Sequence, residues 1–438
     1  MEWQIVLILV FGSLTILLAS GMPIALSFLL INVGGAYVFW GTAGLEQLIL
    51  SMYTSLASFE LLPLPLFILM GEVLYHSGVG PLLISVLDKL MGRLPGRLAL
   101  LSVAAGVVLA VLTGASVGSV AMPGNTLMPD MEKAGYKRPM AIGAIMASGG
   151  LAVMIPPSGL AVLLGAVAEI SIGKILISIV IPGLLMAAFY STYIIGRCWL
   201  QPSIAPAYEV STASFSEILL SGIAYLLPVG GIIFMVTGVI VLGIATPTEA
   251  AATGCFGVFL MAALYRRLNW GVAKKSVTST MEITGMIFLI VCGAKAFSTL
   301  LSFCEITKGV GELILLIGGS PIFTLILMQA IVLIMGCFME SASIMLITLP
   351  IFMPVVKALG FNPVWFAVIY LINIETGLLT PPFGLNLFVM KAVAPPDTLM
   401  KEVYSAVVHF VIINMLVMAV LMAFPQISLC PTGLTRLW

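Results

Sequence analysis

The pattern of apolar and polar positions divides the chain into long hydrophobic stretches separated by short polar or basic segments. The first stretches cover residues 3–20 and 23–40, and others recur as far as residues 404–424. A helix needs about 20 apolar residues to cross a bilayer. The pattern therefore predicts an all-α polytopic membrane protein with about 10–12 membrane spans.

Two of these stretches are interrupted by a double proline. The prolines at 156–157 lie within residues 139–167, and those at 381–382 lie within residues 363–390. Proline removes a backbone donor and ends a helix, and hydrocarbon offers nothing to replace the lost hydrogen bond. Such a break is tolerated where the backbone lines an enclosed site. Each stretch is therefore predicted to be a broken helix at a mid-membrane transport site.

Two further apolar stretches, residues 98–129 and 321–355, are interrupted by small or polar residues. Each arm of the first is about 15 residues long, which is short for a full crossing. Basic residues stand on both flanks of residues 98–129, so the positive-inside rule places both ends in the cytoplasm. This favours a re-entrant hairpin over two complete short helices joined by a periplasmic loop.

The broken segments recur as a repeat when the chain is shifted by 225 residues. Proline or glycine then coincides at five positions: Pro129 with Pro354, Gly135 with Gly360, Pro156 with Pro381, Pro157 with Pro382, and Gly159 with Gly384. Upstream, a shift that is three residues shorter pairs Gly114 with Gly336 and Ser119 with Ser341. The leading flank of residues 321–355 lacks basic residues and suits the periplasm, which predicts two inverted repeats.

These elements predict the division of the chain into scaffold and repeats. In order, the segments are N-terminal scaffold helices (1–60), a first inverted repeat (61–199), a linker (200–217), scaffold helices (218–277), a second inverted repeat (278–403), and a C-terminal scaffold helix with a tail (404–438). Amphipathic stretches at 79–97 and about 306–317 predict helices on the membrane surface.

Composition supports this class of protein. The chain is 61% hydrophobic and only 8% charged, whereas soluble domains carry about 25% charged residues. Its 18 basic residues balance its 18 acidic ones, so the net charge indicates no nucleic-acid partner. The six cysteines form no CxxC pair and are interpreted as packing residues. The absence of a catalytic triad or phosphate loop favours a transporter over an enzyme.

The helix breaks offer groups that could bind ions. Helix N-termini present N–H groups to an anion, whereas freed carbonyls and hydroxyls present oxygen atoms to Na⁺. The candidate hydroxyls are Ser116, Ser119 and Ser158 in the first repeat and Ser341, Ser343 and Thr380 in the second. The alternative is that these small residues pack where helices cross.

Charged residues within apolar stretches are functional candidates. Glu72 and Lys295 stand in equivalent spans, so Lys295 could hold an anionic substrate or pair with Glu72. The alternatives are that its ammonium group reaches the interface or joins a structural ion pair. Glu340 and Glu375 could each ligate a cation or bond exposed backbone amides, and Glu249 is interpreted as a helix cap.

Several short motifs occur in order along nearly the whole chain. They are PLFILMGE (65–72), TGAS (113–116), GY (135–136), IPPS (155–158), IPG (181–183), GIATPTEAA (243–251) and GLLTPPFG (377–384). Together they resemble the large membrane subunit of TRAP (tripartite ATP-independent periplasmic) transporters, the DctM-like family.

The resemblance implies an elevator-type, Na⁺-coupled importer of a small organic acid, either a carboxylate or a sulfonate. A periplasmic substrate-binding protein would deliver the acid, and a separate four-helix small subunit would brace the scaffold. The expected location is the bacterial inner membrane, with both termini periplasmic and with Na⁺ as coupling ion in place of any cofactor. The alternatives are a stand-alone Na⁺/organic anion symporter or antiporter and, in another class, a passive channel.

The resemblance also implies which residues bind sodium. The first sodium site comprises Gly114, Ser116, Ser119, Pro156 and Ser158, and the second comprises Gly336, Glu340, Ser341, Ser343, Thr380 and Pro381. The candidate substrate-binding residues are Ser116, Ser158, Lys295 and Thr380. Na⁺ is the only metal expected.

Overall fold

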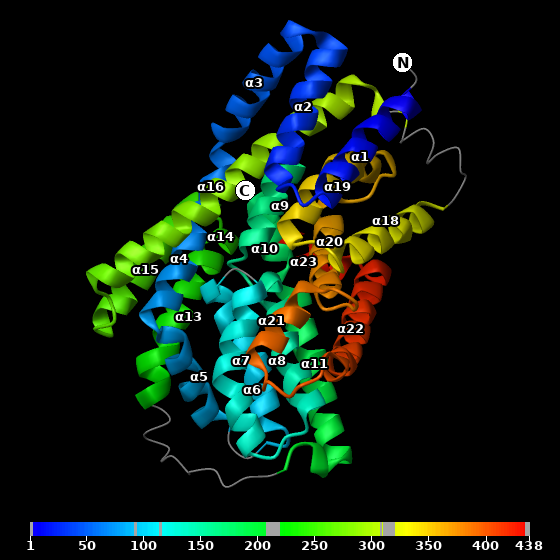
Figure 1. The fold of residues 1–438 in the computed structure, drawn as a ribbon. Helices are drawn as coiled ribbons and strands as arrows, with labels where there is room; N and C mark the ends of the chain where they lie inside the picture. The colour runs from blue at the N-terminus through cyan, green and yellow to red at the C-terminus, as the bar shows by residue number, and fades with distance from the viewer. Residues whose placement is uncertain are drawn as a thin grey trace.

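The structure, a computed structural model, describes residues 3–91, 94–113, 116–206, 220–306, 309 and 320–433. All regular secondary structure in these residues is helical, which confirms the all-α prediction (Figure 1). Among them, six helices are long and apolar enough to cross a membrane, or up to eight if each bent pair counts as one span. The predicted 10–12 spans exceed this number because apolar helices of 10–17 residues were also counted as spans.

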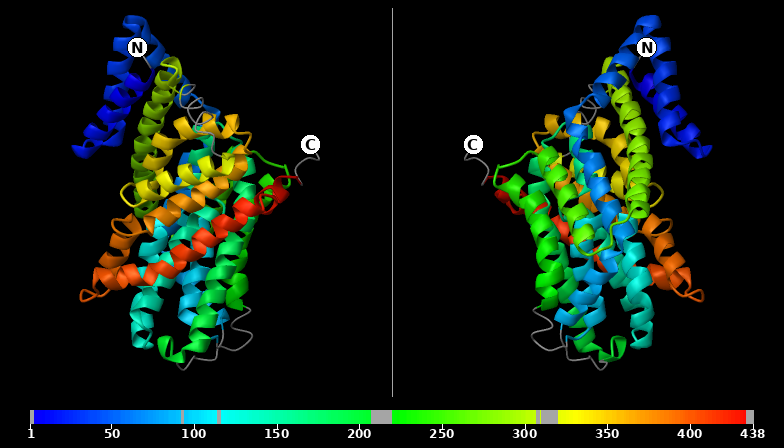
Figure 2. Two further views of the ribbon diagram at one scale, coloured as in Figure 1. Left: turned by 90° about the vertical axis from the view of Figure 1, so that its right-hand side faces the viewer. Right: turned by 90° about the vertical axis from the view of Figure 1, so that its left-hand side faces the viewer.

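The first helices and the long central helix pack together. These are α1 (Trp3–Ala19), α2 (Ile24–Trp40), α3 (Thr42–Leu56), α4 (Pro63–Ser77) and α16 (Trp270–Phe303), with α15 (Pro247–Leu264) against α4. In both views of Figure 2, α1–α3 stand at one end of the molecule and the hairpin of α6 and α7 reaches the opposite end. The hairpins and broken helices lie against this group, with α6 and α9 on α4 and α19 on α16.

Each repeat contains a hairpin followed by a broken helix. The first has α6 (Arg97–Thr113), α7 (Ser116–Lys133), α8 (Arg138–Met154) and α9 (Gly159–Ala168). The second has α18 (Pro321–Gly336), α19 (Ser341–Ala358), α20 (Pro363–Leu378) and α21 (Leu385–Val393). Both double prolines lie between the halves of a broken helix, as predicted, and each has a cis peptide bond.

Further helices connect and flank these units. They are α5 (Val79–Leu90), α10 (Ile172–Ser178), α11 (Val180–Leu200), α13 (Leu227–Ile233), α14 (Val239–Val241), α22 (Met400–Ala423) and α23 (Gln426–Gly433), with π-helical turns at Gly222–Leu226 and Phe234–Gly238. Helix α5 bends by 75° from α4 at Gly78, whose positive φ of 67° suits glycine. Most of the predicted linker and of the second surface helix lies outside the described residues.

The helix bounds support a repeat of 225 residues. Helices α7 and α19 end at Lys133 and Ala358, which are 225 residues apart. The glycines that follow them, Gly135 and Gly360, adopt φ values of 77° and 73°, a region that L side chains avoid. Gly114 and Ala115 lie outside the described residues, so the shorter upstream shift stays a prediction.

The two repeats also pack in the same way. Helix α8 lies against α6 and α7, just as α20 lies against α18 and α19. The second halves of the broken helices cross over, with α9 on α19 and α21 on α7. Residues 140–154 of α8 and 364–378 of α20 are all buried, so the two broken helices form the centre of the core.

Candidate functional site

The tip of the second hairpin is held by Glu340, which caps α19. Its carboxylate accepts hydrogen bonds from the amides of Ala342 at 3.1 Å and Ser343 at 3.4 Å, and from the Ser343 hydroxyl at 3.3 Å. These amides are unpaired in the helix, and a negative charge at this end complements the helix dipole. Of the two roles expected for Glu340, the structure therefore describes the bonding of exposed amides.

The same tip lies directly on the second broken helix. A Cβ atom added to Gly336 would lie 2.6 Å from the Gly377 Cα, so α18 and α20 cross with their backbones in contact. The Cys337 thiol donates to the Pro381 carbonyl at 3.6 Å, and the Ser341 hydroxyl donates to the Glu375 carboxylate at 3.4 Å. The structure thus places Gly336 and Ser341 against α20, with Ser341 on the fully buried Glu375, whereas Glu340 is exposed.

The Thr380 hydroxyl oxygen at this break can still accept a hydrogen bond or ligate a cation. Its hydroxyl donates to the Thr376 carbonyl at 2.7 Å, which uses its one proton. The neighbouring Pro382 carbonyl accepts from the Tyr404 hydroxyl at 2.9 Å. The second break thus offers hydroxyl and carbonyl oxygens, which are the ligands that hard cations prefer.

The first repeat provides a similar but neutral arrangement. Ser119 on α7 and Ser158 are both fully buried. The Ser158 hydroxyl caps α9 by accepting from the Ala161 amide at 3.3 Å. The Ser148 hydroxyl on α8 donates to the Ser119 carbonyl at 3.0 Å and joins the hairpin to the broken helix. Gly114 lies outside the described residues, and Ser116 is described only as the first residue of α7.

Sequence reasoning missed Ser148, although the repeat contains the signal that identifies it. A shift of 225 residues places Ser148 on Asn373. The Asn373 side chain donates to the carbonyl and the side-chain oxygen of Gln329, at 2.6 and 2.8 Å, and joins α20 to α18. A polar bridge from broken helix to hairpin therefore occurs at the same position of both repeats.

Lys295 lies apart from these two groups of residues. Its ammonium group pairs with Glu169, the residue that ends α9. The ten residues of α9 lie between Ser158 and Glu169 and span about 15 Å. The predicted alternative of a Glu72–Lys295 pair is wrong, because Glu72 lies 3.2 Å from the His76 ring nitrogen one helical turn away. Nothing in the local sequence had singled out Glu169.

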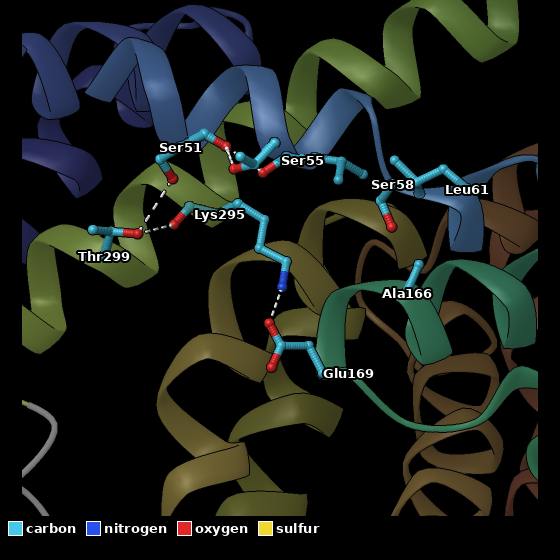
Figure 3. A pocket seen from close by; sticks show the side chains of 10 residues that line it. Ser51, Ser55, Ser58, Leu61, Ala166, Glu169, Lys295 and Thr299 are labelled. Atoms are coloured by element: carbon cyan, nitrogen blue, oxygen red, sulfur yellow. Dashed lines mark hydrogen bonds and ion pairs between the residues drawn. The ribbon is translucent and has the colours of Figure 1, made fainter. Parts of the chain in front are cut away.

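The Lys295–Glu169 pair lies at a cavity of about 520 Å³ (Figure 3). The hydrogen bond donated by Lys295, followed by its positive charge, lowers the pKa of the Glu169 carboxyl. Hydroxyl side chains from α3 and α16 line much of the cavity. The lining residues are Ser51, Thr54, Ser55, Ser58, Leu61, Ala166, Glu169, Val291, Lys295 and Thr299.

Most metal ions in proteins are held by clusters of His, Cys, Asp or Glu side chains. The residues that the structure describes contain no group of three or more of these side chains that could hold a metal ion. Transition metals prefer such nitrogen and sulfur ligands, whereas hydroxyl and carbonyl oxygens suit hard cations. The hydroxyl and carboxylate groups at the helix breaks make these breaks the candidate functional site, with the hydroxyl-lined cavity as a second candidate.

A family model matches most of the chain. It describes the DctM component of the tripartite ATP-independent periplasmic transporters and matches residues 11–427. A C4-dicarboxylate TRAP transporter large permease protein of Pseudomonas aeruginosa is 33% identical over 80% of this chain and 81% of its own length. The match to the family therefore covers both repeats and the scaffold helices.

Other relatives carry different substrate names. The 2,3-diketo-L-gulonate large permease protein of Escherichia coli K12 is 29% identical, over 94% of this chain and 96% of its own. The sialic acid large permease protein of Vibrio cholerae is 28% identical, over 96% of each chain. A crystal structure of the Alcanivorax borkumensis YdaH transporter is similar with a TM-score of 0.58 and 16% identity, over 88% of this chain and 90% of that one. That likeness concerns the fold alone.

Proposed function

The chain belongs to the DctM-component family of tripartite ATP-independent periplasmic transporters, and from this membership we propose that it drives Na⁺-coupled uptake of a small organic acid. It is a large permease subunit and not an enzyme, as the sequence predicts. The acid would be a carboxylate or a sulfonate, delivered by a periplasmic substrate-binding protein. The relatives are named for C4-dicarboxylate, 2,3-diketo-L-gulonate, sialic acid and isethionate.

The oxygen atoms at the second helix break are the observation that carries the proposal. Ser341, Glu375 and Thr380 bring two hydroxyls and a buried carboxylate to the place where the tip of α18 and α19 meets α20. Na⁺ binding would add compensation for the buried carboxylate. In the first repeat, Ser119 and Ser158 would supply the equivalent oxygens, together with Gly114, Ser116 and the Pro156 carbonyl.

An elevator motion fits the division between repeats and scaffold. The hairpins and broken helices would move as one transport domain, because α9 packs on α19 and α21 packs on α7 across the repeats. Helices α2, α3, α4 and α16 would form part of the fixed scaffold. The sodium gradient supplies the energy, and binding of both ion and substrate would permit the movement.

The proposed assembly has three protein components in the bacterial inner membrane. A separate small membrane subunit of four helices would brace the scaffold, and the binding protein would dock from the periplasm. Both termini of the large subunit are proposed to be periplasmic. Within this assembly, Ser116, Ser158, Lys295 and Thr380 remain the candidate substrate-binding residues.

Uptake into proteoliposomes tests this function. The large subunit is reconstituted with its small subunit and assayed with purified binding protein loaded with labelled organic acid. We expect uptake that requires both an inward Na⁺ gradient and the binding protein. Uptake without the binding protein would instead support a stand-alone Na⁺/organic anion symporter or antiporter. Sodium-independent flux that does not saturate would indicate a passive channel and contradict both.

A further inference from the structure

The Lys295–Glu169 pair stands between two cavities. One is the hydroxyl-lined cavity of about 520 Å³, and the second, of about 240 Å³, lies between α9, α16 and α19. Glu169 and Lys295 line both. The second cavity also includes Lys357 and the Pro350–Pro354 region of α19. The ion pair therefore forms part of the wall that divides them.

The pair also joins two groups of helices that would move relative to each other. Glu169 ends α9, which is half of a broken helix, and Lys295 lies on α16, which packs on α2, α3 and α4. Lys295 follows Lys275 by 20 residues of continuous helix, a rise of about 30 Å. By the positive-inside rule, the start of α16 is placed in the cytoplasm by the basic residues Arg266, Arg267, Lys274 and Lys275. The rise therefore puts Lys295 near the periplasmic end.

The larger cavity has one cationic group and several hydrogen-bond acceptors. The hydroxyl protons of Thr54, Ser55 and Thr299 are used on backbone carbonyls, at 2.9, 2.7 and 3.1 Å. Their remaining lone pairs accept hydrogen bonds. In Figure 3 the hydroxyls of Ser51 and Thr299 lie to one side, and the Lys295 ammonium points to Glu169. A fitting ligand has one negative group and several donors.

We propose that this cavity is an entry vestibule for a small organic anion with hydroxyl or amino groups, and that the Lys295–Glu169 pair is the gate at its inner wall. The carboxylate or sulfonate of the substrate takes the place of Glu169 on Lys295. The displaced Glu169 carboxylate remains near the positive charge of Lys357, which lines the same smaller cavity and already contributes to its lowered pKa. Opening the pair connects the two cavities.

This gate rests on the proposed transport function, but the vestibule can be tested without transport. Thr54 is exposed at the cavity, so Thr54→Cys is the reporter. Cys304 and Cys430 are replaced by serine, because the other four cysteines are buried. The probes are 2-sulfonatoethyl methanethiosulfonate, an anion, and its trimethylammonium counterpart, a cation. The measured quantity is the ratio of the anionic to the cationic reaction rate at this cysteine. We expect this ratio to be higher than it is for a free thiol in solution.

Two further variants decide whether Lys295 causes this preference. Adding Lys295→Met is expected to lower the anion-to-cation rate ratio on the order of tenfold, since a charge-assisted contact is lost. Adding Glu169→Gln is expected to raise the ratio, because Lys295 is freed. A ratio that neither variant changes would overturn the vestibule, whatever the transport assay gives.

Uptake with loaded binding protein tests the gate itself. Lys295→Met is expected to raise the KM for uptake, and a charge exchange that combines Lys295→Glu with Glu169→Lys restores an ion pair. If the pair is only structural, the exchanged pair should restore uptake with the wild-type KM. If the pair is the proposed gate, the KM should stay raised, because the positive charge that receives the substrate now lies at the end of α9 and not on α16. If wild type itself lacks Na⁺-driven uptake, the proposed function fails instead, while the probe result still stands.

Discussion

Single hydroxyl groups matter most at the helix breaks, where the backbone hydrogen-bond ladder is interrupted. Ser341 is such a group, since it is almost fully buried and its hydroxyl donates to the buried Glu375. Burial of a carboxylate is costly, and a cation bound beside it would add compensation for that cost. The Ser341 hydroxyl is therefore the group at this break whose removal should affect ion binding most directly.

Ser341→Ala is expected to weaken Na⁺ dependence. Loss of one hydroxyl oxygen should raise the Na⁺ concentration for half-maximal uptake by about tenfold. The measurement is uptake into proteoliposomes at a series of Na⁺ concentrations. Thr192→Ala is the matched control, because the exposed Thr192 hydroxyl bonds only its own helix, at the Ala188 carbonyl. Equal Na⁺ dependence in both variants would remove Ser341 from the site.

At the scale of elements, the crossing of α18 and α20 fixes the position of the tip. Gly336 and Gly377 face each other with no side chain between the backbones. The same proximity lets a polar bridge form between Asn373, one turn before Gly377, and Gln329, two turns before Gly336. Close helix contact through small residues is the usual way for membrane helices to associate. The glycines thus set the distance at which the hydroxyls of the tip meet α20.

Gly377→Ala is expected to destabilise the protein. The added Cβ would lie 2.7 Å from the Gly336 Cα, and such overpacking costs about 1–3 kcal/mol. Thermal unfolding of the purified subunit in detergent measures the loss. Gly285→Ala on α16 is the control, because nothing lies within 4 Å of its added Cβ. An unfolding temperature for Gly377→Ala as high as that of the control would contradict close backbone packing.

The elements could be read from the sequence better than the contacts between them. Hydrophobic length and double prolines predicted the hairpins and broken helices, because each depends on local hydrogen bonding and on membrane thickness. The pairing of Lys295 with Glu169 could not be predicted, because it depends on how α9 and α16 are placed in space. Ser148 was missed because a serine beside glycines indicates only small-residue packing until the hairpin is located.

At the scale of the molecule, the two repeats are also joined at their surfaces. Arg138 at the start of α8 lies 2.6 Å from Asp397, which belongs to the loop between α21 and α22. The hydrogen bond donated by Arg138 lowers the pKa of the Asp397 carboxyl. A lowered pKa in the folded state stabilises the fold above the unfolded pKa, and the gain is lost as the pH falls through the folded value.

Asp397→Asn is expected to lower the unfolding temperature slightly, by an amount that is constant from neutral pH down to about pH 5. The difference from wild type should begin to shrink below the ordinary aspartate pKa of about 3.9, where the unfolded-state carboxyl becomes protonated, and should vanish below the lower folded-state pKa. High salt should shrink it too, because the pair is exposed. Unfolding curves against pH and salt measure this, with Glu46→Gln, an exposed acid on α3, as control. A difference that changes between pH 6 and 8 would contradict the assignment.

The elevator proposal makes opposite predictions for two cross-links. An added Cβ on Gly124 of α7 would lie 2.5 Å from the Val393 side chain of α21, so a Gly124→Cys/Val393→Cys pair joins the repeats within the moving body. A Glu169→Cys/Lys295→Cys pair instead joins that body to α16. With a short thiol-bridging reagent, Na⁺-driven uptake should survive the first link and stop with the second. If the first link also stops uptake while the protein stays folded, the repeats move against each other and the single moving body is wrong.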